Sequence, residues 1–383
     1  MRRAVFLAAS AALAARAAEQ FIGAADPRLQ YVGRFLVNAT DGSRAFDWGG
    51  TAILVTVTGT AYVKARVAAS AGARTKLVVD EPHSPSLEAR NLSQGFSVSE
   101  FFVDEVAGAM GGDVYYAASG LDANQSYTIR ISNALEPLFH GNSGQGYGNG
   151  TMSFFGVYID AGGAALAPPP RRQRSLEWVG DSLTAGFGSR GVRPPCEVSQ
   201  ITSSAHYSYS HILGDALGAN TSIISWSGKG VWKNCCGGAG PAMPVLYRQT
   251  LGNLPAADWV FGAPPSALAI NLGSNDMSQY NGTAQFLRGL ADAFEAFVRD
   301  ATRLYRAPAL PVLLVQGPAN VSEIFGVLQT VHDELAAEGV NVHRVYAFTD
   351  VVDGCSGHPG TRAHAIMAAA LEPQVRTILG WVD

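Results

Sequence analysis

The sequence predicts two domains, an N-terminal all-β sandwich of the jelly-roll type and a C-terminal α/β domain with a parallel sheet. Three observations predict this fold: short alternating runs up to about residue 160, a proline-rich connection, and alternating strand and helix patterns after Ser175. The chain of 383 residues is 47% hydrophobic and 15% charged. This composition excludes intrinsic disorder, because disordered chains are highly charged and poor in apolar groups.

The N-terminus is typical of a secretion signal. Arg2 and Arg3 precede an apolar stretch over residues 4–15, and Ala17 follows as a small residue suited to cleavage. We therefore expect residues 1–17 to be a signal peptide and the protein to be extracellular; the alternative is an amphipathic N-terminal helix. Asn-x-Ser/Thr sequons favour a secreted glycoprotein, and they lie at Asn38, Asn91, Asn124, Asn149, Asn220, Asn281 and Asn320.

Charge and hydropathy exclude two classes of partner. No later segment reaches the roughly 18 uninterrupted apolar residues that a membrane span needs. The formal net charge of −4 argues against binding a polyanion. We expect a monomer that binds neither a membrane nor nucleic acid.

The first domain is expected over residues 25–162. Its β-rich runs include residues 51–58, 61–67, 126–131 and 152–159, separated by turn residues. Within residues 61–67, Val and Ala alternate with Lys and Arg, which is the pattern of a half-buried antiparallel strand. Many short strands at regular spacing are typical of a sandwich or jelly roll.

A linker over residues 163–174 ends in three prolines and an arginine cluster. The second domain, residues 175–383, then alternates strands with helices, which implies a parallel sheet between two helical layers, as in flavodoxin-like folds. Its ligands should bind at the carboxyl ends of the strands. We expect strands at 176–179, 221–226, 267–272, 312–315 and 342–348, and helices at 203–217, 283–305, 323–338 and 361–379.

Ser182 stands where the first of these strands meets a helix, in Gly180-Asp181-Ser182-Leu183. A serine there lies at the carboxyl edge of the sheet, and the helix N-terminus favours developing negative charge. The alternative is a helix-capping serine. Gly228 and Asn275 follow the second and third strands, so with the Ser182 N–H they predict a three-point oxyanion hole.

His358 is expected to be the base, because of the eight histidines it alone lies in the loop before the last helix. His364 is expected on the surface of that helix. Together these residues predict a serine esterase that uses no metal and no organic cofactor.

The blocks around Asp181-Ser182, Gly228, Asn275-Asp276 and His358 resemble the SGNH (GDSL) hydrolase superfamily. The β-rich domain before them, with Phe46-Asp47-Trp48-Gly49-Gly50 near its start, resembles the jelly roll of carbohydrate esterase family 2. The resemblance implies an α/β SGNH hydrolase domain that removes acetyl groups from a polysaccharide or oligosaccharide such as xylan or glucomannan. We also expect Asp181, Asp276 and Trp232 to bind the substrate, with Trp232, beside the Gly228 block, as a surface on which a sugar stacks; for Trp226, next to the same block, we expect core packing.

In that superfamily the acid that orients the histidine usually lies three residues before it, and in this family often two residues before it. Here these positions are Cys355 and Ser356, and neither residue is acidic. Three interpretations stay open. A main-chain carbonyl orients His358, or Asp353 reaches in from five residues before it, or the enzyme is weakened.

Two other functions stay open as well. One is an SGNH esterase or lipase that acts on other small acyl or lipid esters. The other is a carbohydrate-binding protein with a degenerate hydrolase domain, although a decayed site has no reason to keep oxyanion donors.

Four cysteines suit an oxidising compartment. Adjacent cysteines rarely bond to each other, because the peptide between them strains the geometry. We therefore expect Cys235 and Cys236 each to bond to one of Cys196 and Cys355.

Overall fold

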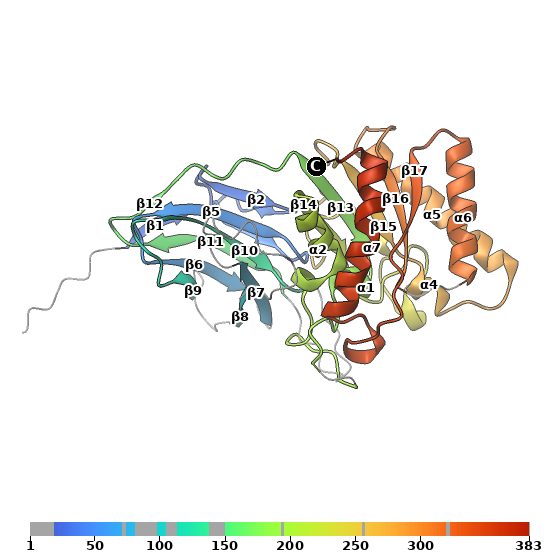
Figure 1. Cartoon of the computed structure of the whole chain (residues 1–383), viewed down its shortest axis with the longest axis horizontal. Helices are drawn as coiled ribbons and strands as arrows, with labels where there is room; N and C mark the ends of the chain where they lie inside the picture. Colours follow the sequence, from blue (N-terminus) through green and yellow to red (C-terminus); the bar gives the residue numbers. More distant parts are fainter. Residues whose placement is uncertain are drawn as a thin grey trace, which may run out of the picture.

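The computed structural model describes residues 19–70, 74–80, 98–104, 113–137, 150–192, 195–254, 257–318 and 322–382. The expected signal peptide and the sequons at Asn91, Asn149 and Asn320 lie outside these residues. Figure 1 shows a β domain at one end and an α/β domain at the other. Among the described residues, no helix combines the length and the apolar character needed to cross a membrane.

In its described residues, the β domain forms two antiparallel sheets of six strands each, which confirms the predicted all-β sandwich. One sheet has the order β3-β4-β11-β6-β9 with β1 beside β11, and the other has β12-β5-β10-β7-β8 with β2 beside β5. The strands are β1 Gln20–Gly23, β2 Leu29–Val32, β3 Leu36–Val37, β4 Arg44–Phe46, β5 Ala52–Thr58, β6 Tyr62–Ala69, β7 Arg74–Asp80, β8 Val98–Asp104, β9 Asp113–Ser119, β10 Ser126–Asn133, β11 Met152–Ile159 and β12 Ala164–Ala165.

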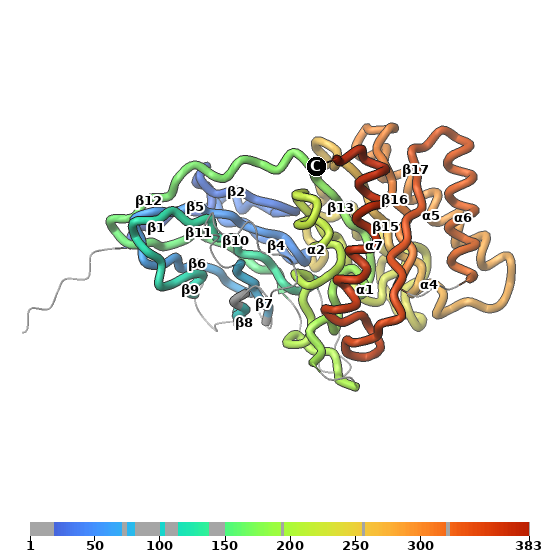
Figure 2. Tube along the Cα trace, in the orientation of Figure 1, coloured from blue at the N-terminus to red at the C-terminus, as the bar shows by residue number. Residues whose placement is uncertain are grey.

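The core of the sandwich follows from the alternation in the sequence. In β6, Val63, Ala65 and Val67 are fully buried, whereas Lys64 and Arg66 are partly exposed. Strand β12 lies within the segment that the sequence predicts as a linker, and it pairs with β5. From β12 the chain runs along the outside of the molecule to the α/β domain (Figure 2).

The α/β domain has a five-stranded parallel sheet of order β14-β13-β15-β16-β17. Helices α2 and α7 pack on one face and α5 and α6 on the other, which confirms the three predicted layers (Figure 1). The elements are β13 Arg174–Gly180, α1 Ser182–Ala185, η2 Ala205–Tyr207, α2 Tyr209–Ala216, β14 Ala219–Ser225, η3 Cys235–Gly237, α3 Met243–Leu246, β15 Ala267–Asn271, α4 Ser274–Met277, α5 Ala284–Leu304, β16 Val312–Gln316, α6 Ser322–Ala337, β17 Val342–Tyr346, η4 Cys355–Gly357 and α7 Thr361–Leu379.

The helix predicted over 203–217 is shorter than expected. Ser208 adopts an extended backbone (φ −75°, ψ 152°), so it separates η2 from α2. Its side chain accepts a hydrogen bond from the His211 N–H and thereby caps α2.

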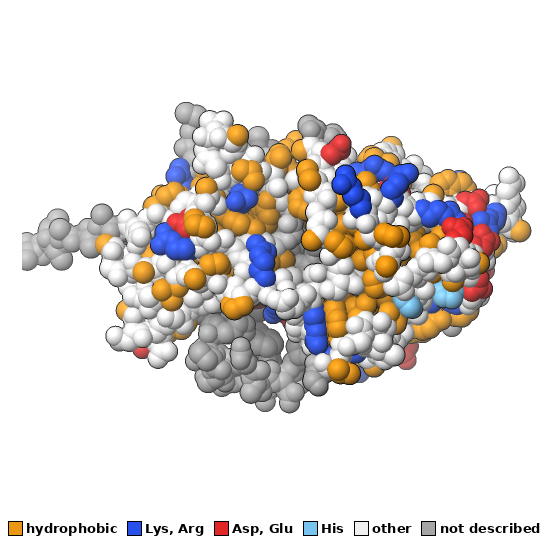
Figure 3. All heavy atoms as spheres, turned by 90° about the horizontal axis from the view of Figure 1, so that it is seen from above, with side chains coloured by type: hydrophobic (Ala, Val, Ile, Leu, Met, Phe, Trp, Pro, Cys, Tyr) orange, Lys and Arg blue, Asp and Glu red, His pale blue; other side chains and the backbone are white. Residues whose placement is uncertain are grey.

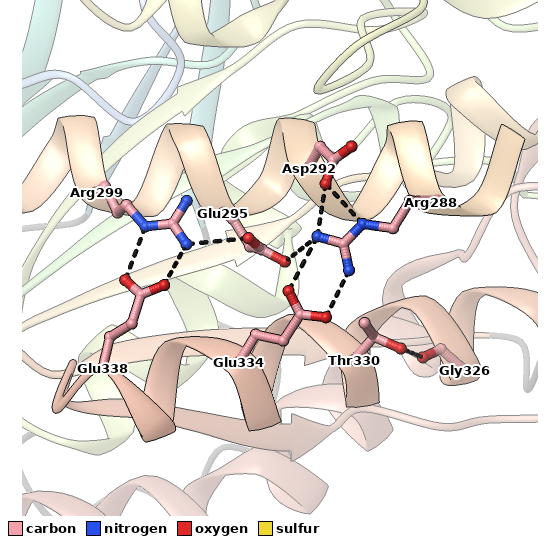
Figure 4. A network of polar contacts seen from close by, with 8 residues as sticks. All are labelled: Arg288, Asp292, Glu295, Arg299, Gly326, Thr330, Glu334 and Glu338. Carbon is pink, nitrogen blue, oxygen red and sulfur yellow. Dashed lines mark hydrogen bonds and ion pairs between the residues drawn. The ribbon is translucent and has the colours of Figure 1, made fainter. Parts of the chain in front are cut away.

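Helix α5 is amphipathic, as its sequence predicts. Its apolar side is buried, and its polar side carries Arg288 and Arg299, which pair with Glu334 on α6 and with Glu338 just after the end of α6 (Figure 4). Figure 3 shows acidic and basic side chains together at the end of the molecule where Figure 1 places these helices. The pairs are largely exposed, so each contributes only about 0–1 kcal/mol to stability.

The two domains share a buried junction. The carboxylate of Asp47 in the β domain accepts hydrogen bonds from the N–H groups of Gly252 and Asn253, both at 2.9 Å. Burial raises the pKa of Asp47 to about 6, and these two N–H groups oppose that rise. Next to it, Trp48 donates from Nε1 to the carbonyl oxygen of Thr250 at 3.1 Å. The β domain is therefore fastened to the α/β domain by side chains that are fully buried.

The disulfides differ from the expected pairing: Cys196 bonds to Cys355, and Cys235 bonds to Cys236. The loop of Cys196 packs on η4, where the Ser356 N–H donates to the Cys196 carbonyl oxygen, and the Cα atoms of the first pair are 4.7 Å apart. Cys235 and Cys236 lie on a different loop. The expectation that adjacent cysteines do not bond was wrong, because η3 is a tight turn in which Cys236 adopts a positive φ of 59°.

This pairing predicts a specific peptide map. A tryptic digest without reductant should release the peptide from Asn234 to Arg248 uncrosslinked and lighter by two hydrogen atoms than its reduced form. The peptides that contain Cys196 and Cys355 should be joined to each other. Mass spectrometry checks this, and any crosslink between Cys235 or Cys236 and the other pair would contradict it.

Candidate active site

Ser182 and His358 are brought together although 176 residues separate them in the sequence. Ser182 is the first residue of α1, directly after β13, and His358 ends the short η4 turn before α7. The Nε2 atom of His358 lies 3.0 Å from the Oγ atom of Ser182. This is the hydrogen-bonded distance that a nucleophile and its base require.

The other ring nitrogen of His358 fixes the orientation of the imidazole. Nδ1 lies 3.1 Å from the carbonyl oxygen of Ser356, so an N–H at Nδ1 donates to that oxygen. Nε2 is then the acceptor that faces Ser182. Burial lowers the pKa of His358, and the Ser356 carbonyl opposes the shift. The neutral form, which can accept a proton, therefore persists to lower pH.

Asp353, the expected candidate for a third catalytic member, is engaged elsewhere. Its carboxylate accepts hydrogen bonds from the N–H groups of Gly360 at 2.7 Å, Arg362 at 3.2 Å and Ala363 at 3.3 Å. These are N–H groups at the start of α7, which have no partner within the helix. Asp353 thus caps α7, and the carbonyl of Ser356 occupies the orienting position beside His358.

The two roles of Asp353 give different expectations for Asp353→Ala. As a cap, we expect the substitution to lower the free energy of unfolding by about 0.5–2 kcal/mol and to change kcat little. A carboxylate that oriented the histidine would instead cost about 10⁴-fold in kcat. Urea unfolding and steady-state kinetics on the same preparation check this, and a loss of kcat above about 10³-fold would restore Asp353 as a catalytic member.

Asp181 was expected near the substrate, but it is fully buried. Oδ1 accepts the Leu183 N–H at 3.0 Å, and Oδ2 accepts the Ser274 hydroxyl at 2.5 Å and Asn275 Nδ2 at 3.1 Å. Burial raises the pKa of Asp181 to about 6, the hydrogen bonds from Ser274 and Leu183 oppose the rise, and the charge of Asp276 adds to it. Asp181 therefore joins the start of α1 to the start of α4 through contacts within the protein.

Asp276 is buried in the same way, and its carboxylate accepts three consecutive N–H groups, those of Val231, Trp232 and Lys233, at 2.6–3.0 Å. Trp232 is 41% exposed, and its ring lies against Phe286. The loop that presents Trp232 is thus held by Asp276.

The expected oxyanion donors lie in this region. Gly228 has a φ of +78°, and a Cβ atom placed on it would meet nothing within 4 Å, so this turn borders open space. Asn275 Nδ2 lies 2.9 Å from the carbonyl oxygen of Lys229 in addition to its contact with Asp181. Both N–H bonds of that amide already have acceptors, so an oxyanion would share one of them.

Sequence reasoning missed two buried side chains, Glu136 and His364. Glu136, from the β domain, is buried. Its carboxylate accepts the N–H of Ser227, the residue before Gly228, at 2.5 Å. Its place after β10 gives no sequence signal, because the contact joins residues from the two domains. His364, expected at the surface, is fully buried, and its Nδ1 accepts the Tyr209 N–H at 3.2 Å. The helical spacing of His364 with the buried Met367 and Leu371 was the signal that could have placed it.

A cavity of about 270 Å³ lies next to Leu183, the residue after the nucleophile. Its lining is mainly apolar and includes Leu272, Met277, Val315 and Ile324. The described residues contain no group of three or more His, Cys, Asp or Glu side chains placed to hold a metal ion.

Comparisons with known proteins identify a family and relatives of this chain. The family model described as GDSL-like Lipase/Acylhydrolase matches residues 176–371. The cellulase/esterase CelE of Acetivibrio thermocellus is 27% identical over 245 residues, which cover 61% of this chain and 29% of that protein. An acetylxylan esterase/glucomannan deacetylase of Cellvibrio japonicus is 24% identical over 379 residues, which cover 94% of this chain and 91% of that protein.

Solved structures share the two-domain fold. A family two carbohydrate esterase from Cellvibrio japonicus superposes with a TM-score of 0.77 at 21% identity, covering 96% of this chain and all of that one. A family two carbohydrate esterase from Clostridium thermocellum, solved in complex with cellohexaose, has a TM-score of 0.76 at 22% identity and covers 92% of this chain and all of that one.

Proposed function

The chain belongs to the family of GDSL-like lipases and acylhydrolases, whose model matches more than half of it, and from this premise we propose that it is a secreted carbohydrate acetylesterase. The observation that carries the proposal is the pairing of Ser182 Oγ with His358 Nε2, in which the Ser356 carbonyl holds the other ring nitrogen. Such a pair is the minimal apparatus for acyl transfer through serine.

The mechanism has two steps. His358 Nε2 takes the proton of the Ser182 hydroxyl as Oγ attacks the carbonyl carbon of the ester. The N–H groups of Ser182 and Gly228, with a shared N–H of Asn275, stabilise the oxyanion. His358 then gives the proton to the departing sugar oxygen, which leaves an acetyl-serine. A water molecule, deprotonated by His358, attacks this ester, and Ser182 recovers its proton as acetate departs.

The proposal that the substrate is a carbohydrate rests on Trp232 and on the relatives. Trp232 exposes part of its ring on the loop that Asp276 holds, and such a ring offers an apolar face to a sugar. The Cellvibrio protein that aligns with almost the whole chain is named an acetylxylan esterase and glucomannan deacetylase. We therefore propose acetylated xylan or glucomannan as the substrate class. The signal-like N-terminus favours extracellular action, and we propose that the protein acts as a monomer.

A second candidate activity is hydrolysis of esters with longer acyl chains. The apolar cavity beside Leu183 favours it, because a volume of about 270 Å³ exceeds what an acetyl methyl group needs. Its lining includes Leu183, which follows the nucleophile in the sequence, and apolar side chains that could bury a longer acyl chain.

A panel of substrates tests the proposal. We expect release of acetate from acetylated xylan and glucomannan, and among simple esters we expect kcat/KM to fall as the acyl chain lengthens from acetate to octanoate. A preference for octanoate would move the assignment to the second candidate. Absence of hydrolysis and of labelling of Ser182 by an organophosphonate would indicate a binding protein instead.

A further inference from the structure

Glu136 is a buried carboxylate that the β domain places beside the catalytic domain. It lies three residues after the end of β10, and it is only 3% exposed. The segment that carries it is fixed on both sides: the Ala134 carbonyl oxygen accepts the Ala205 N–H at 2.7 Å, and the Pro137 carbonyl oxygen accepts Asn253 Nδ2 at 2.6 Å. Glu136 therefore has a defined position relative to the α/β domain.

The carboxylate holds the turn that contains Gly228. Its Oε2 atom accepts the Ser227 N–H at 2.5 Å. The turn is closed by the Lys229 N–H, which donates to the Trp226 carbonyl oxygen at 3.2 Å. A positive φ at the third residue of such a turn, here Gly228, is the requirement of a type II turn. The orientation of the Gly228 N–H depends on this turn, and Glu136 anchors its second residue.

We propose that Glu136 is a positioning residue for acyl transfer: its carboxylate holds the Ser227–Gly228 turn so that the Gly228 N–H meets the oxyanion. The inference rests on the proposed esterase function. Through this contact the β domain contributes to catalysis without touching the ester, since the hydrogen bond from Ser227 crosses the junction. A short hydrogen bond from an N–H to a buried carboxylate is among the stronger ones in proteins.

The electrostatics of the site agree with this role. Burial raises the pKa of Glu136 to about 7, the Ser227 N–H opposes the rise, and the nearby Asp181 adds to it. Keeping a carboxylate in such a place is unfavourable unless a contact offsets its desolvation. Hydrogen bonds from the N–H and the side chain of Ser227 are such contacts.

Asp47 provides a matched control. It too is a buried carboxylate of the β domain that accepts N–H groups of the α/β domain, but its donors are Gly252 and Asn253 and not the Gly228 turn. Glu136→Ala and Asp47→Ala should therefore both lower the free energy of unfolding. Only Glu136→Ala should also impair the oxyanion hole.

The experiment compares kcat and KM of wild type and the two variants on a small acetyl ester, at a temperature well below every unfolding midpoint. Glu136→Ala is expected to lower kcat by roughly 10- to 100-fold with little change in KM, because a displacement of about 1 Å in a catalytic group can cost about 10²-fold. Glu136→Gln, whose amide oxygen can still accept the Ser227 N–H, should recover most of that loss. If Glu136→Ala does not fold, Glu136→Asp, which is one methylene shorter, replaces it.

Two outcomes would overturn the inference. One is a kcat for Glu136→Ala (or Glu136→Asp) close to that of wild type, and the other is an equal loss of kcat in Asp47→Ala. Failure of the proposed function gives a different result, because the wild-type protein itself would then release no acetate.

Discussion

Replacing Ser182 with alanine is expected to lower kcat for acetate release by about 10⁴- to 10⁶-fold, the range found when a serine hydrolase loses its nucleophile. The hydroxyl is the only group removed, and the hydrogen bond to His358 Nε2 is lost with it. The fold should be retained, because α1 is capped by Asp181 and does not depend on the Ser182 side chain. Binding of an oligosaccharide should therefore persist in the variant.

Three measurements define this test. Acetate release gives kcat, organophosphonate labelling followed by peptide mapping identifies the modified residue, and calorimetric titration with a xylo-oligosaccharide reports binding. His358→Ala should show a similar loss, and the double variant should be no slower than either single variant, since the two residues act as a unit. Activity of Ser182→Ala above about 1% of wild type would place the nucleophile elsewhere.

Most of the fold could be predicted because its elements carry strong local patterns. The helices predicted at 283–305 and 361–379 match α5 and α7 almost residue for residue. Period-two alternation likewise identified β6 before any contact was known. Helix α2 was predicted too long because Ser208, which interrupts the pattern, was not recognised as a cap.

Some residues of the site could likewise be predicted from local sequence patterns, whereas others depend on contacts between distant segments. Ser182 and His358 could be placed at strand ends from sequence order alone, and the structure brings them together. The partner of Asp353 could not be decided, because its choice between a ring nitrogen and the N–H groups of α7 depends on a few ångströms of loop geometry. Glu136 and the cysteine pairing could not be predicted either, since each depends on how separate loops pack.

Replacing Asn275 with alanine is expected to lower kcat by about 10²- to 10³-fold, the cost of removing one side-chain donor from an oxyanion hole. Asn275 Nδ2 already has two acceptors, because it lies 3.1 Å from Asp181 Oδ2 and 2.9 Å from the Lys229 carbonyl oxygen. These contacts hold the amide between the turns that follow β13 and β14. An N–H held in that way is preorganised and needs little reorganisation when charge develops nearby.

A variant of Ser274 serves as the control that distinguishes two roles of Asn275, an oxyanion donor and a structural contact of Asp181. Its hydroxyl donates to the same Oδ2 atom of Asp181 at 2.5 Å, from the same helix α4. Ser274→Ala therefore removes a comparable hydrogen bond to Asp181 without removing a proposed oxyanion donor, and we expect it to lower kcat less than about tenfold. Equal losses in Asn275→Ala and Ser274→Ala, measured on the same acetyl ester, would assign Asn275 to the support of Asp181 alone. A loss confined to Asn275→Ala, with KM nearly unchanged, is the result expected of a group that acts in the transition state.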